Sequence, residues 1–497
     1  MNNYLSSEPA AARRRVVILA TCCLALFLVS MDVTIVNVAL PSIRADLDAS
    51  VAGLQWSIDG YTVVVASFLL LSGSMADRFG RRRTFQVGLT VFSLGSLLCS
   101  LAPSTYALVA CRMLQAVGGS MLTPVAMSII VNTFTDPKER ARAIGVWGAV
   151  FGLAMAAGPL LGGVLIETIG WRSIFWVNVP VGALALGLTA RFVPESRAAR
   201  ARRFDLVAQA LVIVALLMFT SALIDGRQLG WTSWRIVTGL GVAAACVVAL
   251  VVWESRRHEP LLDLRFFRSL PFSAATLLAV LAFAAFSGFL FLNSLYLQED
   301  RGLSALGAGL MTLPMAAALV VCSPISGRLV AAGRSRLAVV GAGLAMTVGS
   351  LMLTALTNQT PLALLVVAYV IFGIGLGAIN APITNSAVSG MPRVQAGLAS
   401  AIASTSRQVG ATLGVAFAGS LAGSGIDAAH HADFAASTHA VFWVIAAYGV
   451  AISAIGLLST GARARASAAK VAALLNADES AGPGPTLSPA RTATRAS

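Results

Sequence analysis

Charged residues are scarce in this chain: Asp, Glu, Lys and Arg make up only 11% of its 497 residues, while 57% are apolar. A soluble globular domain typically has about 25% charged residues, so this composition excludes a soluble fold. The sequence also lacks a nucleophile with an adjacent base, a phosphate-binding loop and a soluble output domain. These absences argue against an enzyme and against a receptor, and we expect no cofactor.

Cysteine and histidine are too few and too scattered to predict a metal site. The six cysteines fall in or at apolar runs without metal-ligand spacing, so we expect free thiols that pack as small hydrophobes. His430, His431 and His439 cluster in one expected outer loop, but no Cys, Glu or second His pair accompanies them. We interpret that cluster as a solvated loop and predict no metal ion.

Long apolar runs, in contrast, are abundant. A helix needs roughly 20 apolar residues to cross a bilayer. Arg13, Arg14 and Arg15 precede the first run, which is too long for a signal peptide and is therefore expected to be a retained helix. The runs that meet this length number fourteen: 16–40, 51–75, 85–103, 105–132, 141–166, 171–192, 205–223, 234–253, 272–297, 304–327, 336–357, 361–388, 396–423 and 439–460.

The runs group as six, two and six, which predicts an all-α integral membrane protein with two six-helix bundles and two additional central helices. The loop GSMADRFGRRRT (Gly73 to Thr84) has a degenerate copy, SGRLVAAGRSRL (Ser326 to Leu337), at the corresponding place of the second half. Duplicated halves with a site at their interface are one plan of secondary transporters. The expected units are a cytoplasmic N-terminus (1–15), a six-helix bundle (16–192), two additional helices (205–253), a second six-helix bundle (272–460) and a cytoplasmic, disordered tail (461–497).

Basic residues concentrate in alternate loops, which places both termini in the cytoplasm by the positive-inside rule. An even number of crossings follows from this. The net charge of +14 is therefore explained by orientation and by anionic lipid, without nucleic acid. The richness in Ala and Arg suggests a GC-rich bacterial genome, so we expect a multi-pass protein of a bacterial plasma (inner) membrane.

Four strings resemble motifs of the major facilitator superfamily. GSMADRFGRRRT resembles its loop motif, and MDVTIVNVALP resembles the first-helix motif of its fourteen-helix drug:proton antiporter branch. RMLQAVGG resembles the fourth-helix motif, and GVWGAVFGLAMAAGPLLGG the fifth-helix antiporter motif. Two positions depart from the pattern, Ala116 and Ala154, and both keep a small side chain. The resemblance spans about residues 16–460 and implies the major facilitator fold and an exporter.

The resemblance assigns roles to two groups of residues. The matching residues of a cytoplasmic gate are Gly73, Asp77, Arg78, Gly80 and Arg81, and those of the antiporter motif are Gly145, Gly158, Pro159, Gly162 and Gly163. In the gate, acid and base next to each other can latch the cytoplasmic side through ion pairs that break when the halves rock. In the fifth helix, small residues four apart let another helix approach closely.

Three ionisable residues lie at the same expected depth. Asp32 and Asp59 are each about 12 Å from the outer membrane surface, and Arg112 is about 10 Å from it, at 1.5 Å rise per residue. A carboxyl group in a membrane is expensive unless it is paired or takes up a proton. We predict Asp32 as the principal proton site, Arg112 as the group that tunes it, and Asp59 as a second carboxyl. A structural ion pair, and Na⁺ in place of H⁺, stay open as alternatives.

Other intramembrane polar residues are candidates for a substrate cavity: Asn37, Gln55, Trp56, Tyr61 and Asn293. Arg407 lies within the run 396–423 and needs a partner that the sequence does not identify; Asn380 and Asn385 are possible polar contacts of that layer.

The prediction is a proton-driven exporter of hydrophobic or cationic small molecules that works by alternating access and confers drug or antibiotic resistance. The alternative is an exporter dedicated to one endogenous metabolite, self-made antibiotic or lipid. The expected partners are a small-molecule substrate, H⁺ and the lipid bilayer, and the sequence is compatible with a monomer.

Overall fold

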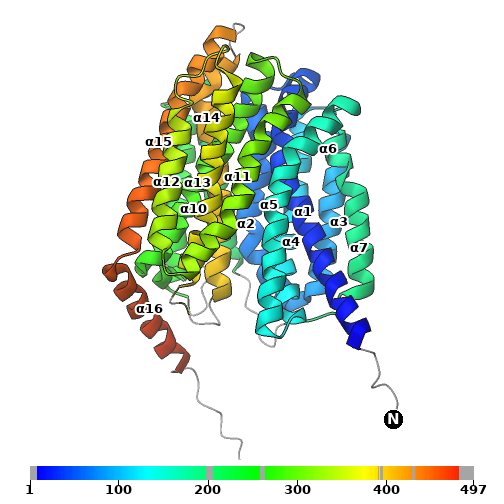
Figure 1. Ribbon diagram of the computed structural model, residues 1–497, viewed down its shortest axis with the longest axis vertical. Helices are drawn as coiled ribbons and strands as arrows, with labels where there is room; N and C mark the ends of the chain where they lie inside the picture. Colours follow the sequence, from blue (N-terminus) through cyan, green and yellow to red (C-terminus); the bar gives the residue numbers. More distant parts are fainter. Residues whose placement is uncertain are drawn as a thin grey trace, which may run out of the picture.

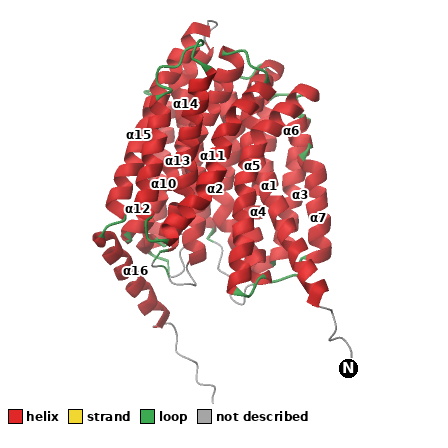
Figure 2. Ribbon diagram, in the orientation of Figure 1, coloured by secondary structure: helices red, strands yellow, loops and turns green. Residues whose placement is uncertain are grey.

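The computed structural model describes residues 8–197, 205–257, 263–389, 391, 396–427 and 431–480, and within these ranges it consists of helices and loops (Figure 2). The helices of the first half are α1 (Glu8–Leu47), α2 (Val51–Phe79), α3 (Arg81–Ser100), α4 (Thr105–Thr133), α5 (Pro137–Thr168), α6 (Ser173–Trp176) and α7 (Asn178–Phe192). A pair follows, α8 (Leu206–Leu229) and α9 (Trp234–Ser255). The rest of the chain forms η1 (Leu264–Arg268), α10 (Leu270–Leu295), η2 (Tyr296–Asp300), α11 (Ala305–Ala331), α12 (Ser335–Leu351), α13 (Leu362–Val388), α14 (Ala396–Asp427), α15 (His431–Ser459) and α16 (Ala462–Ser480).

Each of the fourteen apolar runs coincides with a helix, except that α6 and α7 together cover the run 171–192. Eleven segments in the described part of the chain are long and apolar enough to cross a membrane. Helices α3 and α14 are not among them, and α12 is a shorter apolar helix. The start of α1 lies at the same end of the molecule as α16, the last described helix (Figure 1). This arrangement agrees with an even number of crossings, while the count of fourteen stays a prediction.

The two halves repeat one packing plan. In the first half, α1 packs on α5, α2 on α4, and α3 on both α4 and α7. In the second half, α10 packs on α14, α11 on α13, and α12 on both α13 and α15. The loops after α2 and α11 also share a left-handed glycine, Gly80 (φ 110°) and Gly333 (φ 75°), which allows the tight turn between consecutive helices. The degenerate loop repeat in the sequence therefore reflects a repeated structure.

The halves meet along two seams, α2 with α14 and α5 with α11, which the repeat makes equivalent. The additional pair α8 and α9 lies between the halves in the chain but not in space. Helix α8 packs against α2 and α14, whereas α9 packs mainly on α8 and buries little of its surface. The pair is thus attached to the side of one seam.

The α5–α11 seam is closed at the end of the bundle away from the termini. There, Glu167 accepts a hydrogen bond from the Leu306 backbone N–H at 3.0 Å, and Arg44 pairs with Glu299 at 3.0 Å. Toward the other end, a methyl group at Gly152 would meet Val320 at 3.5 Å, but one at Gly148 or Gly145 would meet nothing within 4 Å. Because these glycines continue the same face of α5, the two helices diverge toward the end that carries the termini.

The prediction of a disordered tail was wrong for residues 462–480, because they form α16. Helix α16 contacts α10 and η1, and its buried residues among the described side chains are Ala464, Ala468, Val471 and Leu475. These positions follow a helical spacing, and alanine is the strongest helix former, so the signal was present in the sequence. Residues 481–497 lie outside the described part.

Candidate functional site

A buried ion pair joins α1 to α4 in the first half. Arg112 Nη1 lies 2.5 Å from Asp32 Oδ2, and the two side chains are 2% and 0% exposed. Gln115, one turn after Arg112, donates from Nε2 to Asp32 Oδ1 at 2.8 Å and accepts from Arg112 Nη1 at 2.8 Å. Both carboxylate oxygens of Asp32 are therefore hydrogen-bonded, as a buried charge requires.

Asn178 is a further partner of Asp32, and the sequence reasoning missed it. Its Nδ2 donates to Asp32 Oδ1 at 3.2 Å and to Ser96 Oγ at 3.0 Å. Asn178 is the first residue of α7, where the sixth apolar run is interrupted, and it is fully buried. An amide beside Pro180 inside an apolar run was the signal that could have identified it.

Arg112 has further partners besides Asp32 and Gln115. Its Nε donates to the Ser57 carbonyl at 3.2 Å, and its guanidinium carbon lies 4.3 Å from the centre of the Tyr61 ring and 5.6 Å from that of Phe175. Aromatic faces stabilise a desolvated guanidinium further. The depth argument thus identified a real contact, and the geometry fits both a proton site and a structural ion pair.

Asp59 lies apart from this network. It is fully buried on α2, and neither carboxylate oxygen has a hydrogen-bond partner within the described residues. An ionised carboxylate without a partner is costly to bury, whereas a protonated one costs much less.

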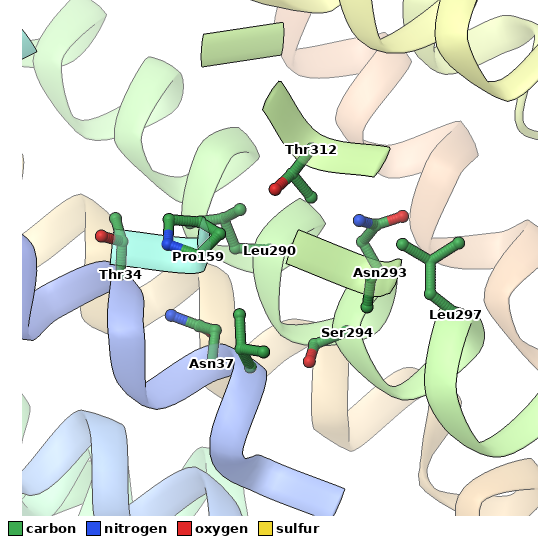
Figure 3. Close-up of a pocket in the computed structure, with 10 residues that line it drawn as sticks. Thr34, Asn37, Pro159, Leu290, Asn293, Ser294, Leu297 and Thr312 are labelled. Carbon is green, nitrogen blue, oxygen red and sulfur yellow. The ribbon is translucent and has the colours of Figure 1, made fainter. Parts of the chain in front are cut away.

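Two of the five residues predicted for a cavity line one small cavity between the halves (Figure 3). Asn37 of α1 and Asn293 of α10 are among its walls, which also include Pro159 of α5 and Thr312 of α11. Figure 3 shows the two amides on opposite sides of this cavity.

The other three cavity candidates have different surroundings, which corrects the expectation of one shared cavity. Gln55 donates to the backbone carbonyls of Val415 and Ala416 and so belongs to the α2–α14 seam. Trp56 is half-buried beside α8, and Tyr61 stacks on Arg112. All three lie on α2, but they face different neighbours.

The loop motif is tied to its own half in this conformation. Arg81 pairs with Asp77 at 3.1 Å, and Glu195 after α7 accepts from the Arg82 backbone N–H at 3.1 Å. A side chain at Gly80 would collide with Glu195, while one at Gly73 would meet nothing within 4 Å. The guanidinium of Arg78 lies 5.9 Å from the ring centre of Phe79. The latch between the halves stays a prediction for another conformation.

The antiporter motif divides its small residues between two helices. A methyl group at Gly158 or Gly162 would collide with Thr34 or Ile35 of α1. Gly163 is equally close to Ala305 and Leu306 of α11. Close packing by small residues four apart is thus present at Gly158 and Gly162, and the spacing recurs at Gly410 and Gly414 of α14, which pack on Val280 and Ala284 of α10.

A family profile described as Major Facilitator Superfamily matches residues 22–415 of the chain. The chain belongs to the Major Facilitator Superfamily. It is therefore a multi-pass membrane protein and a transporter, not an enzyme. Members of this superfamily bind small-molecule substrates within the membrane.

Named relatives include bacterial resistance and export proteins. The chain is 40% identical to "Multidrug resistance protein Stp" of Mycobacterium tuberculosis over 80% of this chain and 74% of that protein. It is 38% identical to "Puromycin resistance protein pur8" of Streptomyces alboniger over 89% and 88%, and 36% identical to "Tetracenomycin C resistance and export protein" of Streptomyces glaucescens over 80% and 74%.

Solved structures of the same fold include transporters of distant sequence. A bacterial homologue of the human lysosomal transporter Spinster, in an inward-facing and unoccupied conformation, matches with a TM-score of 0.62 at 18% identity, covering 92% of this chain and 98% of that one. A D-xylose–proton symporter matches with a TM-score of 0.64 at 13% identity, covering 89% and 97%. These matches establish the superfamily fold alone.

Replacing Asn178 with leucine is expected to lower the stability of the protein. The change removes a hydrogen bond to a charged group, which costs about 1.5–3 kcal/mol. Thermal unfolding in nanodiscs should show that loss of stability. Asn132→Leu is the matched control, because Asn132 is exposed on α4 and donates to the Ser128 carbonyl of its own helix. Equal stability of the two variants would contradict the assigned role of Asn178.

Proposed function

We propose that this chain is a proton-coupled efflux transporter of the fourteen-helix drug:proton antiporter branch, which exports hydrophobic or cationic small molecules and confers drug or antibiotic resistance. The observation that carries the proposal is the buried pair of Asp32 and Arg112, to which Gln115 and Asn178 add hydrogen bonds. The names of the relatives, which include multidrug resistance and antibiotic export, support the direction of transport.

Proton exchange at Asp32 follows from the partners of its carboxylate. Arg112 balances the charge of the Asp32 carboxylate; a movement that lengthens this pair would leave a buried charge, which a proton would neutralise. Asp32 is on α1, and α1 packs on α5, the helix that forms a seam with the other half. Rocking of the halves would thus reach the pair through α1. Asp59, buried without a hydrogen-bond partner in the described part, is the second proton carrier in this proposal.

The conformation supports export by alternating access. With the termini in the cytoplasm, the closed end of the α5–α11 seam faces outward and the diverging end faces the cytoplasm. A substrate would enter from the cytoplasm or inner leaflet, and the small cavity beside Asn37 and Asn293 lies at the closed part of its route.

Replacing Gly309 with valine is expected to shift the population toward an outward-open state. A side chain at Gly309 would collide with the Pro159 carbonyl across the closed part of the α5–α11 seam. Spin labels at Thr168 and Leu310 should report a longer distance in this variant. Gly327→Val on the same helix is the control, because a side chain there would meet nothing within 4 Å. An unchanged distance distribution would argue against closure through this contact.

The test of the function is dye efflux from proteoliposomes that contain the full chain. Ethidium should leave against its gradient when a proton gradient is imposed, and efflux should stop when a protonophore collapses that gradient. Efflux driven by a Na⁺ gradient alone would show that the coupling ion is Na⁺ and not H⁺. Absence of any ethidium transport would favour the alternative, an exporter dedicated to one endogenous metabolite, self-made antibiotic or lipid.

A further inference from the structure

Arg407 is a cation on the inner part of α14, in the second half of the molecule. It is 11 residues after Ala396, which is about 16 Å along the helix. Its Nη2 donates to Thr384 Oγ1 of α13 at 2.7 Å, and its Nη1 lies 3.4 Å from Ser404 Oγ. The Phe283 ring of α10 lies 5.9 Å from the guanidinium carbon. Two helices other than α14 therefore hold this side chain in place.

The sequence around Arg407 in the second half contains no acidic residue. Between residues 301 and 426 the sequence contains no Asp or Glu, and the acids of the span 272–460 are Glu299, Asp300, Asp427 and Asp433, which are all near the outer ends of helices. No ion pair of Arg407 is found among the described residues. On α2, which packs against α14, Asp59 lies on the outer side of the Thr62–Thr412 hydrogen bond, whereas Arg407 lies on its inner side.

The guanidinium also has unused donors. It carries five N–H groups, and the two hydroxyl contacts use two of them. Its Nε is buried and has no hydrogen-bond partner within the described part of the chain. Neutral hydroxyls do not balance a charge inside a membrane, and such unpaired cations mark substrate or ion pathways.

The position lies toward the end of the bundle at which α5 and α11 diverge. Arg407 is half-buried, while Thr384 and its neighbour Asn385 are exposed, four and three residues before the end of α13 at Val388. This is the end toward which α5 and α11 diverge. A ligand that enters between the halves would meet this hydroxyl and guanidinium surface before it reaches the cavity at Asn37.

We propose that Arg407, with Thr384 and Ser404, forms a binding site for an anionic oxygen group, so that the transporter takes apolar molecules that carry a carboxylate or phenolate. The inference rests on the proposed export function and deepens it, because it adds organic acids and zwitterions to the substrate class. Arg407 supplies the charge, the two hydroxyls orient it, and the Phe283 ring supplies an apolar surface beside it. Guanidinium and carboxylate match in charge and in planar geometry.

The test measures equilibrium binding of two probes that differ only in this group, dansyl-leucine and dansyl-leucine amide. The full chain in phosphatidylcholine nanodiscs should bind the acid more tightly than the amide. Arg407→Gln should weaken binding of the acid about ten- to a hundred-fold, which is the range for a hydrogen bond to a charged group. Binding of the amide should change less than twofold, and Arg407→Lys should retain part of the preference for the acid.

Arg334→Gln is the matched control, since it removes an exposed positive charge from the inner loop after α11 and should leave both affinities unchanged. Equal affinity of the wild-type chain for acid and amide, no binding of the acid, or an equal loss of both probes in Arg407→Gln would overturn the proposal. Competition by phosphatidylglycerol that disappears in Arg407→Gln would overturn it in favour of a lipid headgroup. Ethidium efflux by Arg407→Gln separates the two proposals, because export of a cation should survive the loss of the anion site.

Discussion

Replacing Asp32 with asparagine is expected to abolish ethidium efflux driven by a proton gradient. Asparagine keeps the shape of the side chain but has no carboxyl group that could take up and release a proton. Its NH₂ group would also face a donor in either orientation, Arg112 on one side or Gln115 and Asn178 on the other. We therefore expect the loss of gradient-driven efflux to be complete. Downhill exchange of the dye should continue if the variant is folded, because exchange needs no proton transfer.

Asp46→Asn is the control for this prediction. Asp46 is on the same helix and also pairs with an arginine at 2.5 Å, Arg172, but the two side chains are 46% and 43% exposed. A water-exposed carboxylate does not need a proton when its partner leaves, so efflux should stay near the wild-type rate. Loss of both driven efflux and downhill exchange in Asp32→Asn would indicate a structural ion pair. Unchanged driven efflux would move the coupling role to Asp59.

The sequence predicted the helices well because their apolar runs are long and their breaks are marked by charge or by Gly and Pro. It also brought Asp32 and Arg112 together, since alternating helix direction and 1.5 Å rise per residue give the depth of each residue. The same reasoning placed Asp59 at this depth, yet among the described residues no hydrogen bond or ion pair joins the Asp59 side chain to Asp32 or Arg112. Depth specifies a position along the membrane normal, but not the face of a helix or the order of helices around the bundle.

The corrected expectations have the same cause. Gln55, Trp56 and Tyr61 were grouped by their polar character alone, but residues of one helix point in different directions, here toward α14, α8 and α4. The lateral position of α8 and α9 depends on contacts between residues far apart in the sequence. Asn178 and Glu195 were missed because one amide or carboxylate at the end of a helix has no spacing pattern that a single sequence can reveal.

Replacing Arg112 with methionine is expected to destabilise the protein by about 3–5 kcal/mol when Asp32 is ionised, because removal of one partner leaves a buried, uncompensated charge. Methionine fills a similar volume against the Tyr61 and Phe175 rings, so lost packing contributes less than lost charge balance. The midpoint of thermal unfolding in nanodiscs measures the change.

Arg172→Met provides the comparison that separates burial from distance. The Arg172–Asp46 pair has the same 2.5 Å separation as the Arg112–Asp32 pair, but it is exposed to solvent, so its loss should change the stability much less than the loss of Arg112. The double variant Asp32→Asn/Arg112→Met should recover much of the stability that Arg112→Met loses, because neither charge then stays behind. It should still fail to couple efflux to protons. A double variant as unstable as Arg112→Met would mean that Arg112 acts through its packing and its bond to the Ser57 carbonyl, not through the charge of Asp32.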